Sequence, residues 1–101
     1  MQNYNSKLKT DYDLKKRTYS YSIRIINFIN KLPRDNSIQI ITNQLLRSAT
    51  SIGANVVEAQ SCNSRKDFTI FFNHSLKSSN ETKYWLGLLG DIRKSKFSRS
   101  R

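Results

Sequence analysis

Residues that break regular structure are scarce in this chain, with one proline and three glycines among 101 residues. Gly and Pro are the strongest local punctuators of structure, so the long segments between them predict a few long helices rather than many short strands. The length allows one domain. The predicted fold class is all-α, an antiparallel up-and-down helical bundle. We expect a polar N-terminal segment over residues 1–10, a helical bundle domain over 11–92 and a disordered basic tail over 93–101.

Apolar residues recur at helical spacing in two segments before residue 61. The first segment runs from about Asp11 to Lys31, and Pro33 predicts its end near Leu32 because a proline disfavours helical geometry in the residue before it. The second runs from about Ser37 to Gln60. Its stripe consists of Ile38, Ile41, Leu45, Ala49, Ile52, Val56 and Ala59. Its middle is rich in small residues, which predicts the close approach of another backbone.

A third helix is predicted to begin at about Arg65. Ser64 and Asp67 have the spacing of a capping box, in which the serine hydroxyl accepts a backbone N–H three residues on. Apolar residues continue at helical spacing to Leu89, and beyond Gly90 the pattern stops. Three helices of this length joined by short loops must lie alongside one another.

The formal net charge is +11, from 18 Lys and Arg against seven Asp and Glu. Such an excess favours an acidic partner, of which nucleic acid is the commonest, so RNA and DNA are the first candidate partners. Arg17, Arg24 and Lys31 form a basic ridge at spacings of seven on the first helix. This ridge is either a phosphate-binding surface or a solvated face. The tail adds the candidates Arg93, Lys94, Lys96, Arg99 and Arg101.

The first helix is apolar around more than half of its circumference, although a monomeric bundle needs a stripe of only about 100°. The additional face contains Tyr19, Ile23 and Ile26. We interpret it as a subunit contact in a homo-oligomer, with an irregular monomeric core as the alternative.

No catalytic, cofactor-binding or metal site is predicted, because Cys62 and His74 are the only residues of their types. Arg47, Asn55, Glu58 and Glu81 are interpreted as a polar layer that fixes helix register, with Arg47 pairing a glutamate across helices. The sequence predicts no membrane span and no secretory signal, so a cytoplasmic location is expected.

An ordered series of motifs resembles the four-helix bundle proteins encoded in 23S rRNA intervening sequences. The resemblance spans roughly residues 11–92, and its strongest pieces are Gln44–Asn55, Glu58-Ala59, Ser64–Phe68 and Glu81–Leu86. It implies an up-and-down four-helix bundle that assembles into a homopentamer, without enzymatic activity. It also implies kinship with the accessory variability protein of diversity-generating retroelements, which is thought to bind a reverse transcriptase and nucleic acid.

The family has a fourth helix after the Tyr84-Trp85-Leu86 motif, and no apolar periodicity follows Gly90 here. We therefore expect three long helices with the fourth truncated, in a truncated or frameshifted copy. The leading functional hypothesis is a non-catalytic, homo-oligomeric bundle that binds nucleic acid or a nucleic-acid-processing protein. The alternative is a structural or protein-interaction scaffold without nucleic-acid binding.

Overall fold

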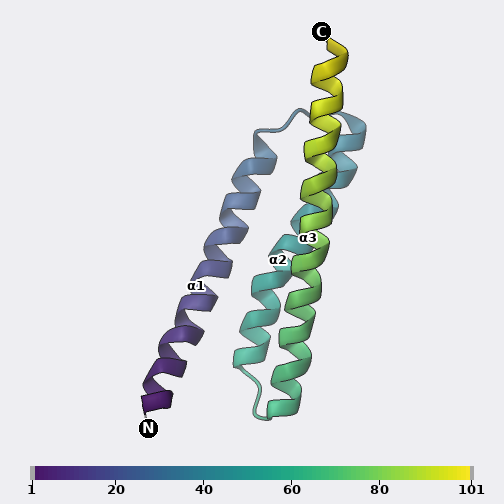
Figure 1. Cartoon of the computed structure of the whole chain (residues 1–101). Coiled ribbons are helices and arrows are strands. Elements are labelled where there is room, and N and C mark those ends of the chain that lie inside the picture. Colours follow the sequence, from purple (N-terminus) through teal and green to yellow (C-terminus); the bar gives the residue numbers. More distant parts are fainter. Residues whose placement is uncertain (1, 101) are drawn as a thin grey trace.

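The computed structural model describes the backbone of residues 2–100 and the side chains of residues 13–95. It consists of three helices, α1 (Gln2–Asn30), α2 (Asn36–Gln60) and α3 (Arg65–Ser100), and residues 2–100 contain no strand. The all-α prediction is confirmed. Figure 1 shows three long rods whose chain direction alternates, in a molecule that measures 61 × 21 × 17 Å along its principal axes. Within the described residues, no helix combines the length and the apolar character that a bilayer span requires.

Local capping chemistry sets the starts of α2 and α3. Asp35 precedes α2 in extended conformation, and its carboxylate accepts a hydrogen bond from the backbone N–H of Ile38 at 3.0 Å. Ser64 accepts one from the N–H of Asp67 at 3.1 Å, as the capping-box spacing predicts. The backbone N–H groups of the first helical turn have no carbonyl acceptor within their own helix, and each of these bonds supplies one of them with an acceptor.

α2 is the central helix of the molecule. It packs against both α1 and α3, whereas no Cα atoms of α1 and α3 lie within 8 Å of each other among the described residues. Five of the seven residues of the predicted α2 stripe are buried, and Ile41 and Ile52 are half-buried. The core cluster draws on all three helices and the loop after α1, and it consists of Ile25, Leu32, Ile38, Leu45, Ala49 and Leu89. Burial of a leucine or isoleucine side chain stabilises the folded state by roughly 1.5–3 kcal/mol.

The small residues of α2 permit the close approach that the sequence predicts. Gly53 is buried against α1, and a Cβ atom added to it would lie 3.2 Å from Oγ1 and 3.3 Å from Cβ of Thr18. Thr18 is itself only half-buried, and its hydroxyl donates to the carbonyl of Leu14 within its own helix at 2.9 Å. The absent side chain of Gly53 therefore sets how near α1 comes to α2.

Both ends of the chain differ from the prediction. α1 begins at Gln2 rather than at Asp11, and α3 continues through Gly90 to Ser100, so residues 93–100 are helical rather than disordered. Hydrophobic periodicity marks only the buried part of a helix. Lys, Arg and Gln can extend the helix beyond the core, because their helix propensities are high. One exposed glycine costs only about 1 kcal/mol relative to alanine, which does not stop a helix already formed.

Candidate functional site

The groove between α1 and α3 brings together most of the basic side chains that the sequence singles out on α1. It has a volume of about 640 Å³, and Ile52 of α2 lies between its two walls. The wall from α1 includes Arg17 and Arg24 of the basic ridge. The complete lining is Leu14, Lys16, Arg17, Thr18, Ser20, Tyr21, Arg24, Ile52, Ser79 and Lys83.

The lining of this groove combines half-buried apolar residues with exposed basic residues. Leu14, Tyr21 and Ile52 are half-buried and supply apolar surface, while Arg17, Arg24 and Lys83 are exposed. The groove is therefore apolar within and basic at its edges. Periodicity in the sequence identifies the ridge on α1. It cannot place Lys83 on the opposite wall of the groove, because that placement depends on how α1 and α3 pack around α2.

Lys31, the third member of the basic ridge, lies just beyond the end of α1. Its backbone N–H donates to the carbonyl of Phe28 at 3.1 Å, and its side chain is exposed. It does not line the groove. The ridge therefore continues past the groove toward the loop that contains Pro33.

The basic C-terminal residues belong to a helix that extends past its neighbours. α3 has 36 residues and α2 has 25, and Figure 1 shows the C-terminal end of α3 rising beyond the connection between α1 and α2. Arg93 and Lys94 are exposed on this projecting end. The side chains of Lys96, Arg99 and Arg101 lie outside the described residues. We call residues 93–100 the overhang.

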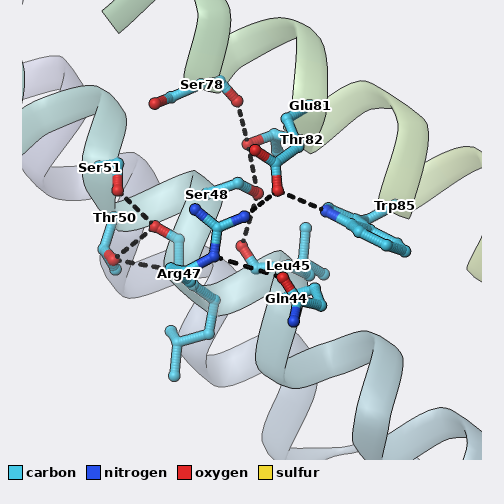
Figure 2. Close-up of polar contacts among 11 residues, drawn as sticks. Gln44, Leu45, Arg47, Ser48, Thr50, Ser51, Ser78, Glu81, Thr82 and Trp85 are labelled. Atoms are coloured by element: carbon cyan, nitrogen blue, oxygen red, sulfur yellow. Dashed lines mark hydrogen bonds and ion pairs between the residues drawn. The ribbon is translucent and has the colours of Figure 1, made fainter. Parts of the chain in front are cut away.

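The structure brings together two of the four residues predicted for the polar layer. Arg47 of α2 forms an ion pair with Glu81 of α3, and its Nε donates to Oε1 of Gln44 at 3.3 Å (Figure 2). Glu81 also accepts a hydrogen bond from Nε1 of Trp85 at 2.9 Å. The prediction that Arg47 pairs with a glutamate across helices therefore agrees with the structure, and Trp85 is a member that the sequence did not identify.

Asn55 and Glu58 do not join this polar layer. The side-chain amide of Asn55 donates to the carbonyl of Ser51 in its own helix at 2.8 Å, and Glu58 is exposed near the end of α2. The spacing of 11 residues places Glu58 on the same side of α2 as Arg47. It cannot bring the two side chains together, because about three helical turns, roughly 16 Å, separate them along the axis.

A second polar set is buried between α2 and α3. The hydroxyl of Thr82 donates to Oγ of Ser48 at 3.0 Å, and the Ser48 hydroxyl donates back to the carbonyl of Leu45 at 3.2 Å. Ser75 donates to the carbonyl of Ile52 across the same interface at 2.9 Å. Ser75 and Thr82 are spaced by seven on α3, so they lie on one side of that helix, and both bond to α2.

The candidate subunit-contact residues are exposed. Tyr19, Ile23 and Ile26 have 70%, 45% and 40% of their surface accessible. Tyr19 borders a hollow of about 300 Å³ between α1 and α2, whose other wall includes Gly53, Ala54 and Val57 of α2. The hollow differs from the basic groove, because its walls are α1 and α2, whereas the groove lies between α1 and α3.

Among the described side chains that could bind metal or act as nucleophiles, Cys62 and His74 lie in different elements. Within the described residues, no cluster of three or more His, Cys, Asp or Glu side chains could hold a metal ion. His74 makes an edge contact with Phe71. Desolvation, followed by the nearby charges of Asp67 and Glu58, raises the pKa of the Cys62 thiol. A raised pKa reduces the thiolate fraction, and the thiolate is the reactive form.

Comparison with known proteins identifies the family. The family model described as 23S rRNA-intervening sequence protein matches residues 10–98. A crystal structure from Bacteroides thetaiotaomicron, described as a protein of unknown function from the S23 ribosomal protein family, is similar with a TM-score of 0.73. It is 42% identical, and the match covers 83% of this chain and 73% of that chain. No curated protein matches. The chain belongs to the 23S rRNA-intervening sequence protein family, as the sequence resemblance implied.

Proposed function

We propose that this protein is a non-catalytic, homo-oligomeric helical bundle that binds nucleic acid as an accessory protein. The observation that carries the proposal is the net charge of +11, together with the position of the overhang. Eight residues of helix extend about 12 Å, and this segment contains four basic residues and no acid. A projecting basic helix can follow a phosphate backbone without steric hindrance from the rest of the bundle.

The binding is expected to be independent of nucleotide sequence. Contacts from Lys and Arg to phosphates position a protein on nucleic acid but do not read bases. The ridge residues Arg17, Arg24 and Lys31 are the second candidate surface. The overhang is better supported, because its two described basic side chains, Arg93 and Lys94, are exposed, whereas Arg17 and Arg24 face a groove with an apolar interior.

We further propose that copies of the chain associate through the face that includes Tyr19, Ile23 and Ile26. The support is the hollow beside Tyr19 and the exposure of these apolar side chains, which a stable monomer would leave in contact with water. A homopentamer of up-and-down bundles and kinship with the retroelement accessory protein are what the family resemblance implies. We propose that the fourth helix implied by the family resemblance lies beside α1 and α3.

Binding of labelled RNA and DNA duplexes, measured against salt concentration, tests the nucleic-acid proposal. Neutralising Arg93, Lys94 and Lys96 to glutamine should reduce the slope of log K against log salt by about 2–3 for DNA, since each phosphate contact contributes about 0.9. The matched control neutralises one Arg and two Lys elsewhere on α3, namely Arg65, Lys66 and Lys77. Light scattering on the same samples reports the mass of the assembly with and without nucleic acid.

Each readout can contradict the proposal. Affinity that does not change with salt, or no binding at low salt, would eliminate electrostatic recognition. Equal effects of the two triple variants would eliminate the overhang as the site. If an oligomer forms while neither RNA nor DNA binds, the protein is a scaffold instead.

A further inference from the structure

A small pocket lies beside the loop that connects α1 to α2. It has a volume of about 140 Å³, and α1, the loop and α2 all contribute to its lining. All of its lining residues come from residues 29–43, and it shares none of them with the groove between α1 and α3. The packing of α1 against α2 therefore sets the shape of this pocket, whatever lies beside α1 and α3.

The pocket has an apolar floor and a polar rim. Ile29 is half-buried, while Leu32 and Ile38 are 9% and 2% exposed and belong to the core cluster. The rim consists of exposed polar side chains, namely the carboxamides of Asn30, Gln39 and Asn43 and the guanidinium of Arg34. A ligand in this pocket would thus have an apolar surface beneath it and hydrogen-bonding groups around it.

The three carboxamides of the rim have no hydrogen-bond partner within residues 13–95. By contrast, the amide of Asn55 donates to the carbonyl of Ser51, and the side chain of Gln44 accepts from Arg47. Each carboxamide has an acceptor oxygen and two donor hydrogens. Three of them around one pocket therefore suit a ligand whose edge presents donors and acceptors side by side.

The volume of the pocket restricts the part of a ligand that can enter it. A cavity of about 150 Å³ in another protein holds a benzene molecule, so this pocket has room for one six-membered ring. A nucleobase combines such a ring with an edge of donors and acceptors, and Asn and Gln side chains are suited to bond that edge. An unpaired base leaves its edge open to side chains, which is how proteins recognise single strands.

The pocket lies beside the base of the overhang. Leu32 of its floor belongs to the same core cluster as Leu89, which precedes Arg93 by about one helical turn. The connection between α1 and α2 and the projecting end of α3 lie at the same end of the molecule (Figure 1). The described charged residues of this end are the exposed cations Lys31, Arg34, Arg93 and Lys94, the exposed acid Asp91, and Asp35, which caps α2.

We propose that this pocket binds one unpaired base of a single-stranded nucleic acid, whose phosphates contact the cations of the loop and the overhang. The inference rests on the proposed nucleic-acid binding and specifies which form is bound. Contacts to phosphates alone predict the opposite preference, because a duplex has the higher charge density and releases more counterions per contact. A preference for single strands therefore reports on the pocket rather than on the overhang.

Fluorescence anisotropy with the full chain tests the pocket. The probes are labelled oligo(U) and the same strand paired with oligo(A). The wild-type chain should bind the single strand at least about threefold more tightly than the duplex. N30A/N43A should bind oligo(U) about tenfold more weakly than the wild-type chain, because two hydrogen bonds to the base are lost. Its binding of the duplex should not change, so this variant should prefer the duplex.

Asn73 and Asn80 provide the matched control. Both are exposed on α3 and line no part of the pocket, so N73A/N80A should keep the preference for the single strand. Neither double variant changes the net charge, so the phosphate contacts of the overhang are kept in both. Far-UV circular dichroism establishes that the variants fold. Q39A removes the third carboxamide and should also weaken the binding of oligo(U).

The outcomes separate the pocket from the proposed function. If the wild-type chain binds the duplex as tightly as the single strand, or more tightly, the pocket proposal is overturned while nucleic-acid binding stands. Equal effects of the two double variants would have the same meaning. No binding of either form at low salt would instead contradict the proposed function, and the pocket proposal would fail with it.

Two further measurements identify the ligand. Oligo(dU), alone and paired with oligo(dA), forms a DNA arm, and an effect of N30A/N43A in one arm only supports the pocket and shows whether RNA or DNA supplies the base. Light scattering reports the mass of the assembly. A smaller mass for N30A/N43A than for N73A/N80A would assign the rim to a contact between copies of the chain, which overturns the proposal.

Discussion

α3 is joined to α2 by side-chain hydrogen bonds that cross between the helices, whereas α1 packs on α2 through apolar and small residues. The bonds of Ser75 and Thr82 and the ion pair of Arg47 all link α2 to α3. On α1, the hydroxyls of Thr18 and Ser22 instead donate to carbonyls of their own helix. Hydrogen bonds are directional and apolar contacts are not. The register of α3 on α2 is therefore set by specific polar pairs, whereas the position of α1 on α2 is set by how well their surfaces fit together.

The largest effect on the free energy of unfolding is expected at Gly53, where α1 packs closely on α2. Replacing Gly53 by leucine should lower the free energy of unfolding by about 1–3 kcal/mol, because even a Cβ atom there would lie 3.2 Å from Oγ1 of Thr18. Urea denaturation followed by circular dichroism measures the change. Combining it with T18A should recover part of the loss.

Gly87 of α3 is the control for this experiment. A Cβ atom added there would have no neighbour within 4 Å, so G87L should stabilise the protein by up to about 0.8 kcal/mol through helix propensity. If both leucine variants changed stability in the same direction, shape at Gly53 would not explain how α1 docks.

A smaller effect is expected at the buried hydroxyl pair. T82V removes one of the two hydroxyls and should lower the free energy of unfolding by about 1 kcal/mol. Since Ser48 and Thr82 are hydrogen-bonded, the S48A/T82V double variant should show a coupling of about 0.5 kcal/mol or more. The control is T69V, because Thr69 is exposed and bonds only its own helix in the described structure. Purely additive effects would contradict a specific cross-helix role.

The smallest effect is expected at the ion pair of Arg47 and Glu81. The two side chains are 57% and 36% exposed, and exposed pairs contribute about 0.2–1 kcal/mol. R47Q should therefore reduce the free energy of unfolding by less than about 1 kcal/mol, and the difference should shrink in high salt. Denaturation at two salt concentrations measures both. A salt-independent loss above about 2 kcal/mol would mean that this pair, rather than the buried hydroxyls, fixes the register.

The predicted parts of the fold are those determined by local chemistry. The α2 stripe through Leu45 and Ala49, and the cap at Ser64, follow from spacings within one segment of sequence. Ile25 of α1 and Leu32 of the loop after it also belong to the core. The spacings do not reveal that Lys83 of α3 faces the ridge of α1, because this depends on the placement of three helices.

The structure departs from the predictions at positions that local spacing alone does not determine. The apolar pattern of the sequence stops at Gly90, yet α3 continues through it, because one exposed glycine is a small cost in a long helix. The sequence predicts that Glu58 shares a layer with Arg47, because both lie on one side of the second helix. Residues on the same side but three turns apart do not meet, whereas Trp85 reaches Glu81 across one turn.

The absence of close contact between α1 and α3 in the described chain also has a consequence for folding order. Every helix packs on its neighbour in sequence, which gives the low contact order of helical proteins that fold in about microseconds to milliseconds. α1 leaves the ribosome first and has no packing partner until α2 has been synthesised. α2 and α3 form a hairpin with its own polar contacts, so we expect this hairpin to be the cooperative unit and α1 to be the helix that opens first in hydrogen exchange.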